Sequence, residues 1–286
     1  MLRYEAWSAT CDTLHAHTQL LGKLAVALAP PEPQLQHAAL LLSARGWETL
    51  PLPLRGESVV VGLDLQDHEA VVEHSDGRVA RVPLTPNRAV ADVTADVLEA
   101  VGGGVEIDPT PQEVHWTVPL DEDREHSTYD AEQVATYFAD ATRAALALAE
   151  YRAPFRGRKT PVNAWWGSFD LAVSLFSGEP ADPPSDDFIM RNSMDAQEVA
   201  VGWWPGDPRY GNAAYYGYAH PPTDHFKDAD LAPAKWVEEM GLYLLESDDH
   251  DEAVAFARAV FRHACLTCDW DPTLLASAEG DPPPVS

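Results

Sequence analysis

The chain has 286 residues, enough for one large domain or two small ones, and 45% of them are hydrophobic, which suffices for a substantial core. Its 19 basic residues against 46 acidic ones give a formal net charge of −27. This balance argues against binding to nucleic-acid phosphates and against attraction to an anionic membrane surface, because both need clustered positive charge.

The cysteines and the apolar segments indicate where the protein resides. Three cysteines are an odd and low number for a disulfide framework. No apolar run approaches the roughly 18 residues of a membrane span, and the N-terminal residues contain no apolar signal core. We therefore expect a cytoplasmic protein, and no motif calls for a cofactor or a metal.

The first part of the chain alternates helical and extended patterns. Apolar residues at spacings of three and four predict a helix that begins at Asp12, an expected N-cap, and ends before Pro30. The extended segments that follow are residues 37–54, 58–66, 69–74 and 78–84. A second helix is expected over residues 85–101, where three consecutive glycines stop it.

The second part begins with a proline-broken extended stretch over residues 105–120. Asp130 and Gln133 resemble a capping box and predict a long helix that runs to about Tyr151. Further strands are expected at 197–204 and 213–220, and a last helix at 249–265. The tail from residue 276 is small, acidic and rich in proline, and it is expected to be disordered.

This order predicts an α+β fold in which antiparallel sheet is packed by helices. Helix, strands and helix occur twice, with a boundary near residue 110, which suggests two similar halves. We expect an N-terminal half over 1–110, a C-terminal half over 111–275 that shares its core, and a tail over 276–286. Two such halves would place a cleft between them.

The segment 161–178 has two unlike faces when it is read as one strand. Trp165, Phe169, Leu171, Val173 and Leu175 alternate on an apolar face. The opposite face carries Trp166, Ser168, Asp170, Ala172 and Ser174. A carboxylate and an indole on one sheet face are typical of the wall of a binding cleft.

The strand at 197–204 divides in the same way, with Glu198 and Trp204 on one side, and Tyr218 follows on a third strand. If these strands pair, Asp170 and Glu198 are candidate catalytic carboxylates, able to act as acid and base as in glycoside hydrolysis. Trp166, Trp204 and Tyr218 are the ligand-binding candidates. The alternative is that the tryptophans fill the junction between sheet and helices while the acids lie at the solvent edge.

Three further residues are candidates with structural alternatives. His126 and Asp130 lie four residues apart and suit a metal pair or a His–Asp dyad, with His126 as a third catalytic candidate. Capping of the helix that it precedes is the favoured interpretation of Asp130. Lys23 could bind an anionic group, or it could interact with the dipole at the end of the first helix.

Several segments together resemble the domain of unknown function family 5996, whose members have no known activity. The residues that carry this resemblance are Leu14–His15, Gln19–Lys23, Ala44–Gly46, Leu63–Asp64, Asp67–His68, Pro111–Glu113, Asp123, His126, Tyr129–Asp130, Trp166–Val173, Phe176–Gly178, Glu198–Val199, Trp204–Gly206 and Tyr216–Pro222.

The chain also departs from the family pattern. The pattern has histidines at the positions of Asn163 and Gln197, arginines at those of Leu175 and Glu179, and a tryptophan pair at Ala38–Ala39. If those residues formed an active site, this chain has lost part of it, which favours ligand binding or altered chemistry.

The expected function is therefore the binding of a small molecule, with or without catalysis, in an aromatic and carboxylate-lined cleft. One alternative is a structural or interaction protein, such as a homodimer, whose aromatic strands are simply core. A second alternative is a carboxylate-based hydrolase.

Overall fold

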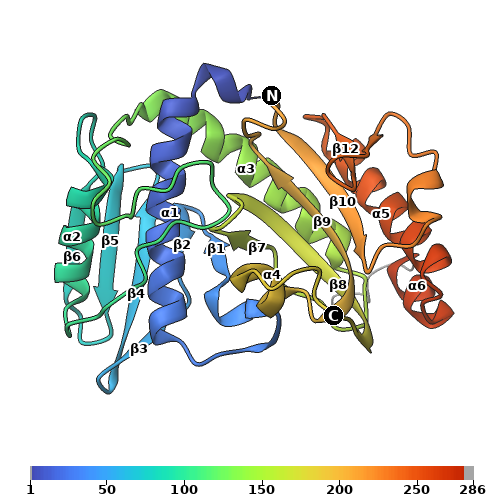
Figure 1. The fold of residues 1–286 in the computed structure, drawn as a ribbon, viewed down its shortest axis with the longest axis horizontal. Helices are drawn as coiled ribbons and strands as arrows, with labels where there is room; N and C mark the ends of the chain where they lie inside the picture. The colour runs from blue at the N-terminus through green and yellow to red at the C-terminus, as the bar shows by residue number, and fades with distance from the viewer. Residues whose placement is uncertain (1, 280–286) are drawn as a thin grey trace, which may run out of the picture.

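The computed structural model describes residues 2–279, and over these residues the fold is α+β (Figure 1). Twelve antiparallel strands form one twisted sheet. The helices are η1 (Tyr4–Ala6), α1 (Ser8–Leu28), η2 (Pro33–Ala38), α2 (Val90–Val101), α3 (Ala131–Arg152), α4 (Phe188–Ser193), η3 (Phe226–Asp228), α5 (His250–Thr267) and α6 (Pro272–Glu279). No helix within residues 2–279 combines the length and the apolarity needed to cross a membrane.

The sheet runs from one end of the molecule to the other in the order β11-β12-β10-β9-β8-β7-β1-β2-β4-β5-β6, with β3 paired to β4. The strands are β1 (Leu40–Leu42), β2 (Gly46–Glu48), β3 (Leu52–Leu54), β4 (Glu57–Asp64), β5 (Glu69–His74), β6 (Val79–Pro83), β7 (Asn163–Trp165), β8 (Asp170–Pro180), β9 (Ala196–Trp204), β10 (Ala214–His220), β11 (Lys235–Val237) and β12 (Leu242–Leu245).

The first six strands and the last six meet at the β1–β7 pair, where Leu40 lies opposite Ala164. The sheet is therefore continuous through the point where the chain passes from its first to its second set of strands. Whether the two sets are similar in structure stays a prediction.

One face of this sheet carries α1, α2, α3 and α5. Leu40, Ala164 and Leu171 are successive register partners, and they place the apolar sides of β1, β7 and β8 on the same face. α1 contacts β4, α2 contacts β5, α3 contacts β8 and α5 contacts β10 on this side. Along β8, β9 and β10, every second side chain lies on this face. The side chains between them point to the opposite face, away from α3 and α5.

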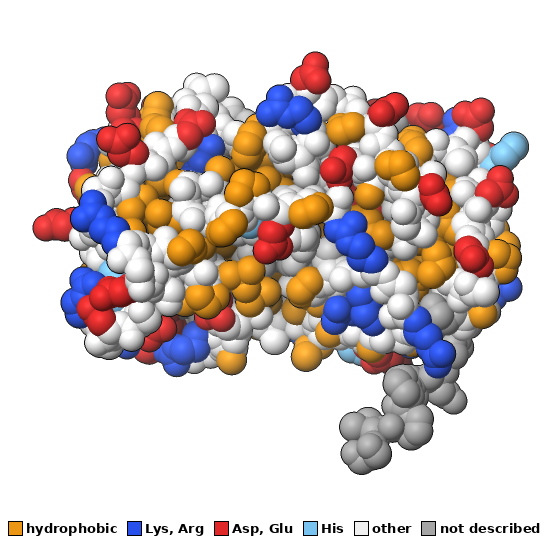
Figure 2. Space-filling view, turned by 90° about the horizontal axis from the view of Figure 1, so that it is seen from below, with side chains coloured by type: hydrophobic (Ala, Val, Ile, Leu, Met, Phe, Trp, Pro, Cys, Tyr) orange, Lys and Arg blue, Asp and Glu red, His pale blue; other side chains and the backbone are white. Residues whose placement is uncertain are grey.

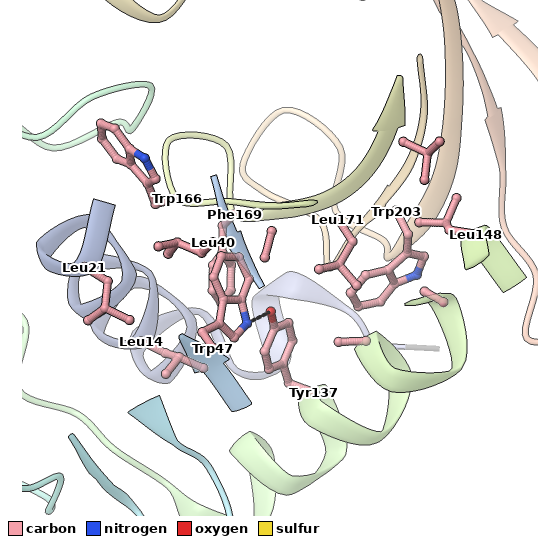
Figure 3. Packing of buried hydrophobic residues seen from close by; sticks show 14 of the residues in the cluster. Leu14, Leu21, Leu40, Trp47, Tyr137, Leu148, Trp166, Phe169, Leu171 and Trp203 are labelled. Carbon is pink, nitrogen blue, oxygen red and sulfur yellow. Dashed lines mark hydrogen bonds between the residues drawn. The ribbon is translucent and has the colours of Figure 1, made fainter. Parts of the chain in front are cut away.

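The centre of the core is aromatic (Figure 3). The Trp47 indole N–H donates a hydrogen bond to the Tyr137 hydroxyl at 3.0 Å, which joins β2 to α3. The Phe169 ring stacks on both, at centroid distances of 5.3 Å from Trp47 and 5.0 Å from Tyr137. The turn before β8 is thus anchored in the same core that holds α1 and α3.

Helix boundaries agree with the sequence where a side-chain cap defines them. Asp130 caps α3 by accepting hydrogen bonds from the backbone N–H groups of Glu132 and Gln133, as predicted. The predicted N-cap of α1 is wrong: Asp12 lies inside the helix, where it accepts a hydrogen bond from the Tyr4 hydroxyl at 2.9 Å.

Two other boundaries differ. α2 begins at Val90 rather than at residue 85, because residues 85–87 belong to the turn that precedes it. At the C-terminus α6 continues to Glu279, inside the stretch expected to be disordered, and residues 280–286 lie outside the described residues.

Candidate functional site

The segment 161–178 is a hairpin and not one strand, so the prediction of a single strand is wrong. β7 ends at Trp165, residues 166–169 form a tight turn, and β8 begins at Asp170, which lies opposite Trp165. Phe169 takes a left-handed conformation, with φ of 58°, to close the turn. Trp166 and Asp170 are therefore not neighbours along one strand, although the alternation from Asp170 onward is as expected.

A cavity of about 100 Å³ lies over the face of β8, β9 and β10 that points away from α3 and α5. Its floor consists of alternating residues of these strands: Asp170, Ala172, Ser174, Glu198, Ala200, Tyr216 and Tyr218. Its roof consists of η2 and α4, which contact each other. In Figure 1, α4 lies over β8 near the middle of the sheet.

The cavity adjoins a more open hollow of about 360 Å³ that shares Asp170 and both tyrosines. Trp204 lines this hollow, and its ring lies edge-on to that of Tyr216 at a centroid distance of 5.7 Å. Aromatic rings therefore extend from the closed cavity to the open hollow.

Asp170 is 4% exposed and lies at one end of the cavity. Its carboxylate accepts hydrogen bonds from the Ser168 and Tyr216 hydroxyls. Burial raises the pKa of Asp170 to about 6, and the two hydroxyl donors only partly offset this effect.

Glu198 is equally buried and lies toward the other end of the cavity. The hydroxyls of Ser174 and Tyr218 hydrogen-bond its carboxylate. Burial raises the pKa of Glu198 to about 7, against the opposing influence of these bonds and of the Arg158 charge. Within residues 2–279, no ion pair joins a lysine, arginine or histidine to Asp170 or Glu198.

The sheet register separates the backbone positions of the two acidic residues. Phe176 lies opposite Glu198 and is six residues along β8 from Asp170. The Cα atoms of Asp170 and Glu198 are therefore roughly 20 Å apart along the strands, at about 3.3 Å per residue. Glycosidase carboxylate pairs lie only about 5–9.5 Å apart. The carboxyl groups themselves lie closer together than the Cα atoms, because each is hydrogen-bonded to one of two stacked tyrosines whose ring centroids are 6.2 Å apart.

A third carboxyl group, which the sequence did not single out as a site residue, lies at the cavity mouth. Glu113 has φ of 57°, and its carboxylate fills the space that a side chain at Gly167 would need. Burial of the carboxylate, together with the charges of Asp170 and Asp187, raises the pKa of Glu113 to about 7. Glu113 is nevertheless exposed as a residue, and water at the mouth weakens this shift.

Buried polar side chains along one stripe of α1, beginning with His15 and Gln19, hold the segments that carry Asp170 and Glu113. His15 and Gln19 lie one helical turn apart, and the His15 Nε2–H donates to the carbonyls of Trp166 and Gly167 at 2.9 and 3.0 Å. The Gln19 amide donates to the carbonyls of Trp166 at 2.9 Å and Gln112 at 2.8 Å, and its oxygen accepts from the Gln112 N–H at 3.1 Å. α1 therefore positions both the turn before Asp170 and the loop that carries Glu113.

Lys23 continues this stripe and does not line the cavity. Its ammonium nitrogen lies 5.4 Å from the centre of the Trp166 ring and 3.9 Å from a carboxylate oxygen of Asp108. Trp166 itself lines the cavity, and its indole N–H donates to the Ala38 carbonyl at 3.1 Å. Figure 3 shows Trp166 beside α1, apart from the Trp47–Tyr137 pair.

His126 and Asp130 also lie away from the cavity, and they do not pair with each other. The His126 Nδ1 lies 2.7 Å from a carboxylate oxygen of the buried Asp123. Burial alone would lower the pKa of His126, but the hydrogen bond and charge of Asp123 outweigh it and raise the pKa. Asp130 instead caps α3, so the predicted His126–Asp130 dyad is wrong.

One acidic cluster in the described part of the chain has a spacing that a metal ion could bridge: Asp64, Asp67 and Glu69. Arg45 already forms ion pairs with Asp64 and Asp67 there. The cluster is therefore accounted for by an arginine at the end of a β-strand.

The structure thus brings Trp166, Asp170, Glu198 and Tyr218 around one cavity, places Trp204 in the adjoining hollow, and leaves Lys23, His126 and Asp130 outside both. Residues 1–277 match the family of unknown function DUF5996. The chain belongs to this family. No curated protein and no solved structure matches it.

Three positions at which the sequence is expected to depart from the family pattern, Asn163, Leu175 and Gln197, are not gathered in the cavity. The Asn163 amide donates to the side chain of Gln36 at 3.0 Å, and Gln36 lines the cavity. Leu175 and Gln197 alternate onto the face that carries the helices. Of these three positions, only Asn163 contacts the cavity wall.

Proposed function

We propose that this DUF5996 member binds a small organic molecule in the cavity between β8–β10 and the roof formed by η2 and α4. The observation that carries this proposal is a pair of buried carboxyl groups, Asp170 and Glu198, that open into one cavity with hydroxyl partners but no cationic partner among the described residues. A buried carboxyl without a counter-charge costs folding free energy, and such groups concentrate at functional sites.

The walls of the cavity support the same proposal. Aromatic and apolar side chains with a few convergent polar groups are typical of small-molecule sites. Three non-glycine residues that line the cavity have left-handed backbone conformations: Gln34, Leu35 and Glu113. Strained backbone of this kind clusters at ligand sites.

Catalysis is a second candidate function, and the pKa values favour it. Carboxyl groups with pKa values of about 6 and 7 suit general acid–base catalysis near neutral pH. The two carboxyl groups are hydrogen-bonded to tyrosines whose ring centroids lie 6.2 Å apart, and their paired action in a hydrolase stays a prediction.

A screen against a cavity-filled variant tests the proposal. Ala200 lies on the floor, so Ala200→Leu should occupy the space that a ligand needs, whereas Ala149→Leu adds the same atoms on an exposed position of α3. Amines, sugars, nucleosides and organic acids would be compared by thermal shift. Compounds that raise the Tm of the wild type and of Ala149→Leu, but not of Ala200→Leu, support the proposal.

Two results would contradict it: no stabilising compound in the whole panel, or equal stabilisation of all three proteins. Homodimer formation and cytoplasmic location are separate predictions, which light scattering and cell fractionation would test.

A further inference from the structure

The hydroxyl groups around the cavity are committed as donors. Tyr216 and Ser168 donate to Asp170, while Tyr218 and Ser174 hydrogen-bond Glu198. A hydroxyl has one proton, so after it has donated to a carboxylate its oxygen can only accept from a ligand. The carboxylates are themselves acceptors when ionised. The polar groups on the cavity floor therefore offer hydrogen-bond acceptors to a ligand.

Three amide and indole groups of the lining, those of Gln34, Gln36 and Trp166, also donate within the protein. The Gln34 amide donates to Asp195, and the Gln36 amide donates to the Gln34 carbonyl at 3.1 Å. The Trp166 indole N–H is bound to the Ala38 carbonyl. A ligand that fits this lining must supply the hydrogen-bond donors, because a buried acceptor without a donor is costly.

Arg158, whose charge acts on Glu198, does not take this role. The Arg158 guanidinium lies 4.3 Å from the centre of the Phe176 ring and donates to the Gln34 side chain. Its charge lowers the pKa of Glu198, yet no ion pair joins the two within the described residues. Glu198 therefore keeps room for a cation from outside the protein.

The net charge of −27 attracts cations of every kind and so does not select one class of cation over another. Figure 2 shows acidic, basic and apolar side chains interspersed on the face seen from below, although the net charge is −27. Selection for one class of cation has to come from the carboxylates in the cavity, where burial strengthens their interaction with a bound charge.

Aromatic rings lie along the floor near the two carboxylates. The rings of Tyr216 and Tyr218 are nearly parallel, with an interplanar angle of 8° and centroids 6.2 Å apart. Aromatic faces attract cations and also cover an alkyl chain. The lining therefore offers an anionic group at each end and an aromatic surface along its length.

We propose that the ligand is an organic dication, an amine with one ammonium or guanidinium group bound at Asp170 and the other at Glu198. Two cationic groups are proposed because the two carboxyl groups are bound to different hydroxyls, those of Tyr216 and Tyr218, whose ring centroids lie 6.2 Å apart. The alkyl chain between them lies against Tyr216 and Tyr218. This inference rests on the proposed small-molecule site and specifies the class of its ligand.

Calorimetric titration of the full chain with α,ω-diaminoalkanes of three to eight carbons, and with spermidine, tests the inference. The matched diols and dicarboxylates of the same lengths serve as uncharged and oppositely charged probes. We expect the diamines to bind with an affinity that depends on chain length, and the diols and dicarboxylates to bind at least tenfold more weakly.

Charge-matched variants assign the binding to the cavity. Asp170→Asn and Glu198→Gln each remove one negative charge from the cavity and should each weaken diamine binding at least tenfold. Asp121→Asn and Glu73→Gln remove the same charge from exposed positions and should bind like the wild type. Circular dichroism of all four variants checks that they are folded.

The outcomes separate this inference from the proposal on which it rests. Binding of a diol or dicarboxylate that Ala200→Leu abolishes overturns the dication and leaves the small-molecule site standing. Diamine binding that all four charge variants weaken equally reflects the overall charge and overturns the inference. Failure of every probe, together with the absence of any hit in the wider thermal-shift panel, overturns both.

Discussion

The Tyr216 hydroxyl donates a hydrogen bond to Asp170 although these residues lie on strands that are not adjacent, with β9 between them. Gly202 of β9 makes this contact possible, since a side chain there would collide with the Tyr216 ring and with the Leu171 carbonyl. The absence of one side chain on the middle strand thus lets a tyrosine of β10 reach the carboxylate of β8.

Gly202→Ala should therefore displace Tyr216 and destabilise the protein. The new methyl group meets the ring and the backbone of β8, and overpacking of this kind costs about 1–3 kcal/mol. Urea denaturation would measure the loss. Gly211→Ala is the control, because a methyl group at Gly211 meets nothing within 4 Å. Equal stability of the two variants would show that Tyr216 does not lie across Gly202.

Asp170→Asn should stabilise the protein at alkaline pH. The folded-state pKa of Asp170, about 6, lies above its ordinary value of 3.8, so its contribution to stability is complete below pH 4 and is lost as the pH rises through 6. The difference of about 2 pKa units corresponds to as much as about 3 kcal/mol. The amide oxygen can still accept from Tyr216 and carries no charge.

Denaturation from pH 4 to pH 8 would test this dependence. We expect Asp170→Asn to gain stability over the wild type by about 1–3 kcal/mol at pH 8 and to lose most of that gain at pH 4. The charged neighbours of Asp170 include Glu113, which would add its own titration, so Glu113→Gln belongs in the series. A constant difference between the two proteins at all pH values would contradict a raised pKa for Asp170.

The sequence predicted the strand faces better than the path of the chain between them. Alternation with a period of two placed Glu198 and Tyr218 on the same face as Asp170, because that pattern is set by the pleat of each strand. Tyr216 has the same signal, two residues before Tyr218, and was left out of the predicted site. The turn at 166–169 was missed because Phe169, an ordinary strand former, closes it in a left-handed conformation.

The roof of the cavity could not be predicted from local patterns. η2 and α4 lie about 150 residues apart in the sequence and meet only through the folded sheet. The same holds for Lys23 and His126, whose partners Asp108 and Asp123 were not identified as such by spacing. Their residue types suggested functional roles for Lys23 and His126, but neither side chain lines the cavity.

Gln19→Leu should destabilise the protein and weaken ligand binding together. The substitution removes the partners of the Gln112 N–H and carbonyl groups and one partner of the Trp166 carbonyl, all of them at least partly buried. Each unsatisfied group costs about 1–3 kcal/mol, so a total loss of about 2–4 kcal/mol is expected in urea denaturation. The loop that carries Glu113 should also become susceptible to proteolysis, because Gln19 holds it to α1.

Thr142→Val is a useful comparison for Gln19→Leu. It also removes a side-chain hydrogen bond to a helical carbonyl, but from an exposed position of α3. Its stability should stay within about 0.5 kcal/mol of the wild type. If Gln19→Leu changes the stability equally little, and the 112–113 loop resists protease as in the wild type, then Gln19 does not hold this loop to α1.

His15 should stay neutral far below the usual pH of histidine titration. Burial lowers its pKa to about 4, and the hydrogen bonds to the Trp166 and Gly167 carbonyls oppose this only in part. These two carbonyls are acceptors, so the proton resides on Nε2. Because the folded-state pKa lies below the unfolded one, the contribution of His15 to stability is complete above pH 6.5 and is lost as the pH falls toward 4.

Long-range ¹H–¹⁵N correlation spectra of the protein would measure both the tautomer and the titration of His15. We expect the Nε2–H pattern from pH 8 to about pH 5, with protonation centred near pH 4. The exposed His225 provides an internal comparison in the same spectra. Protonation of His15 near pH 6.5, or an Nδ1–H tautomer, would mean that its ring does not hold the turn that leads into Asp170.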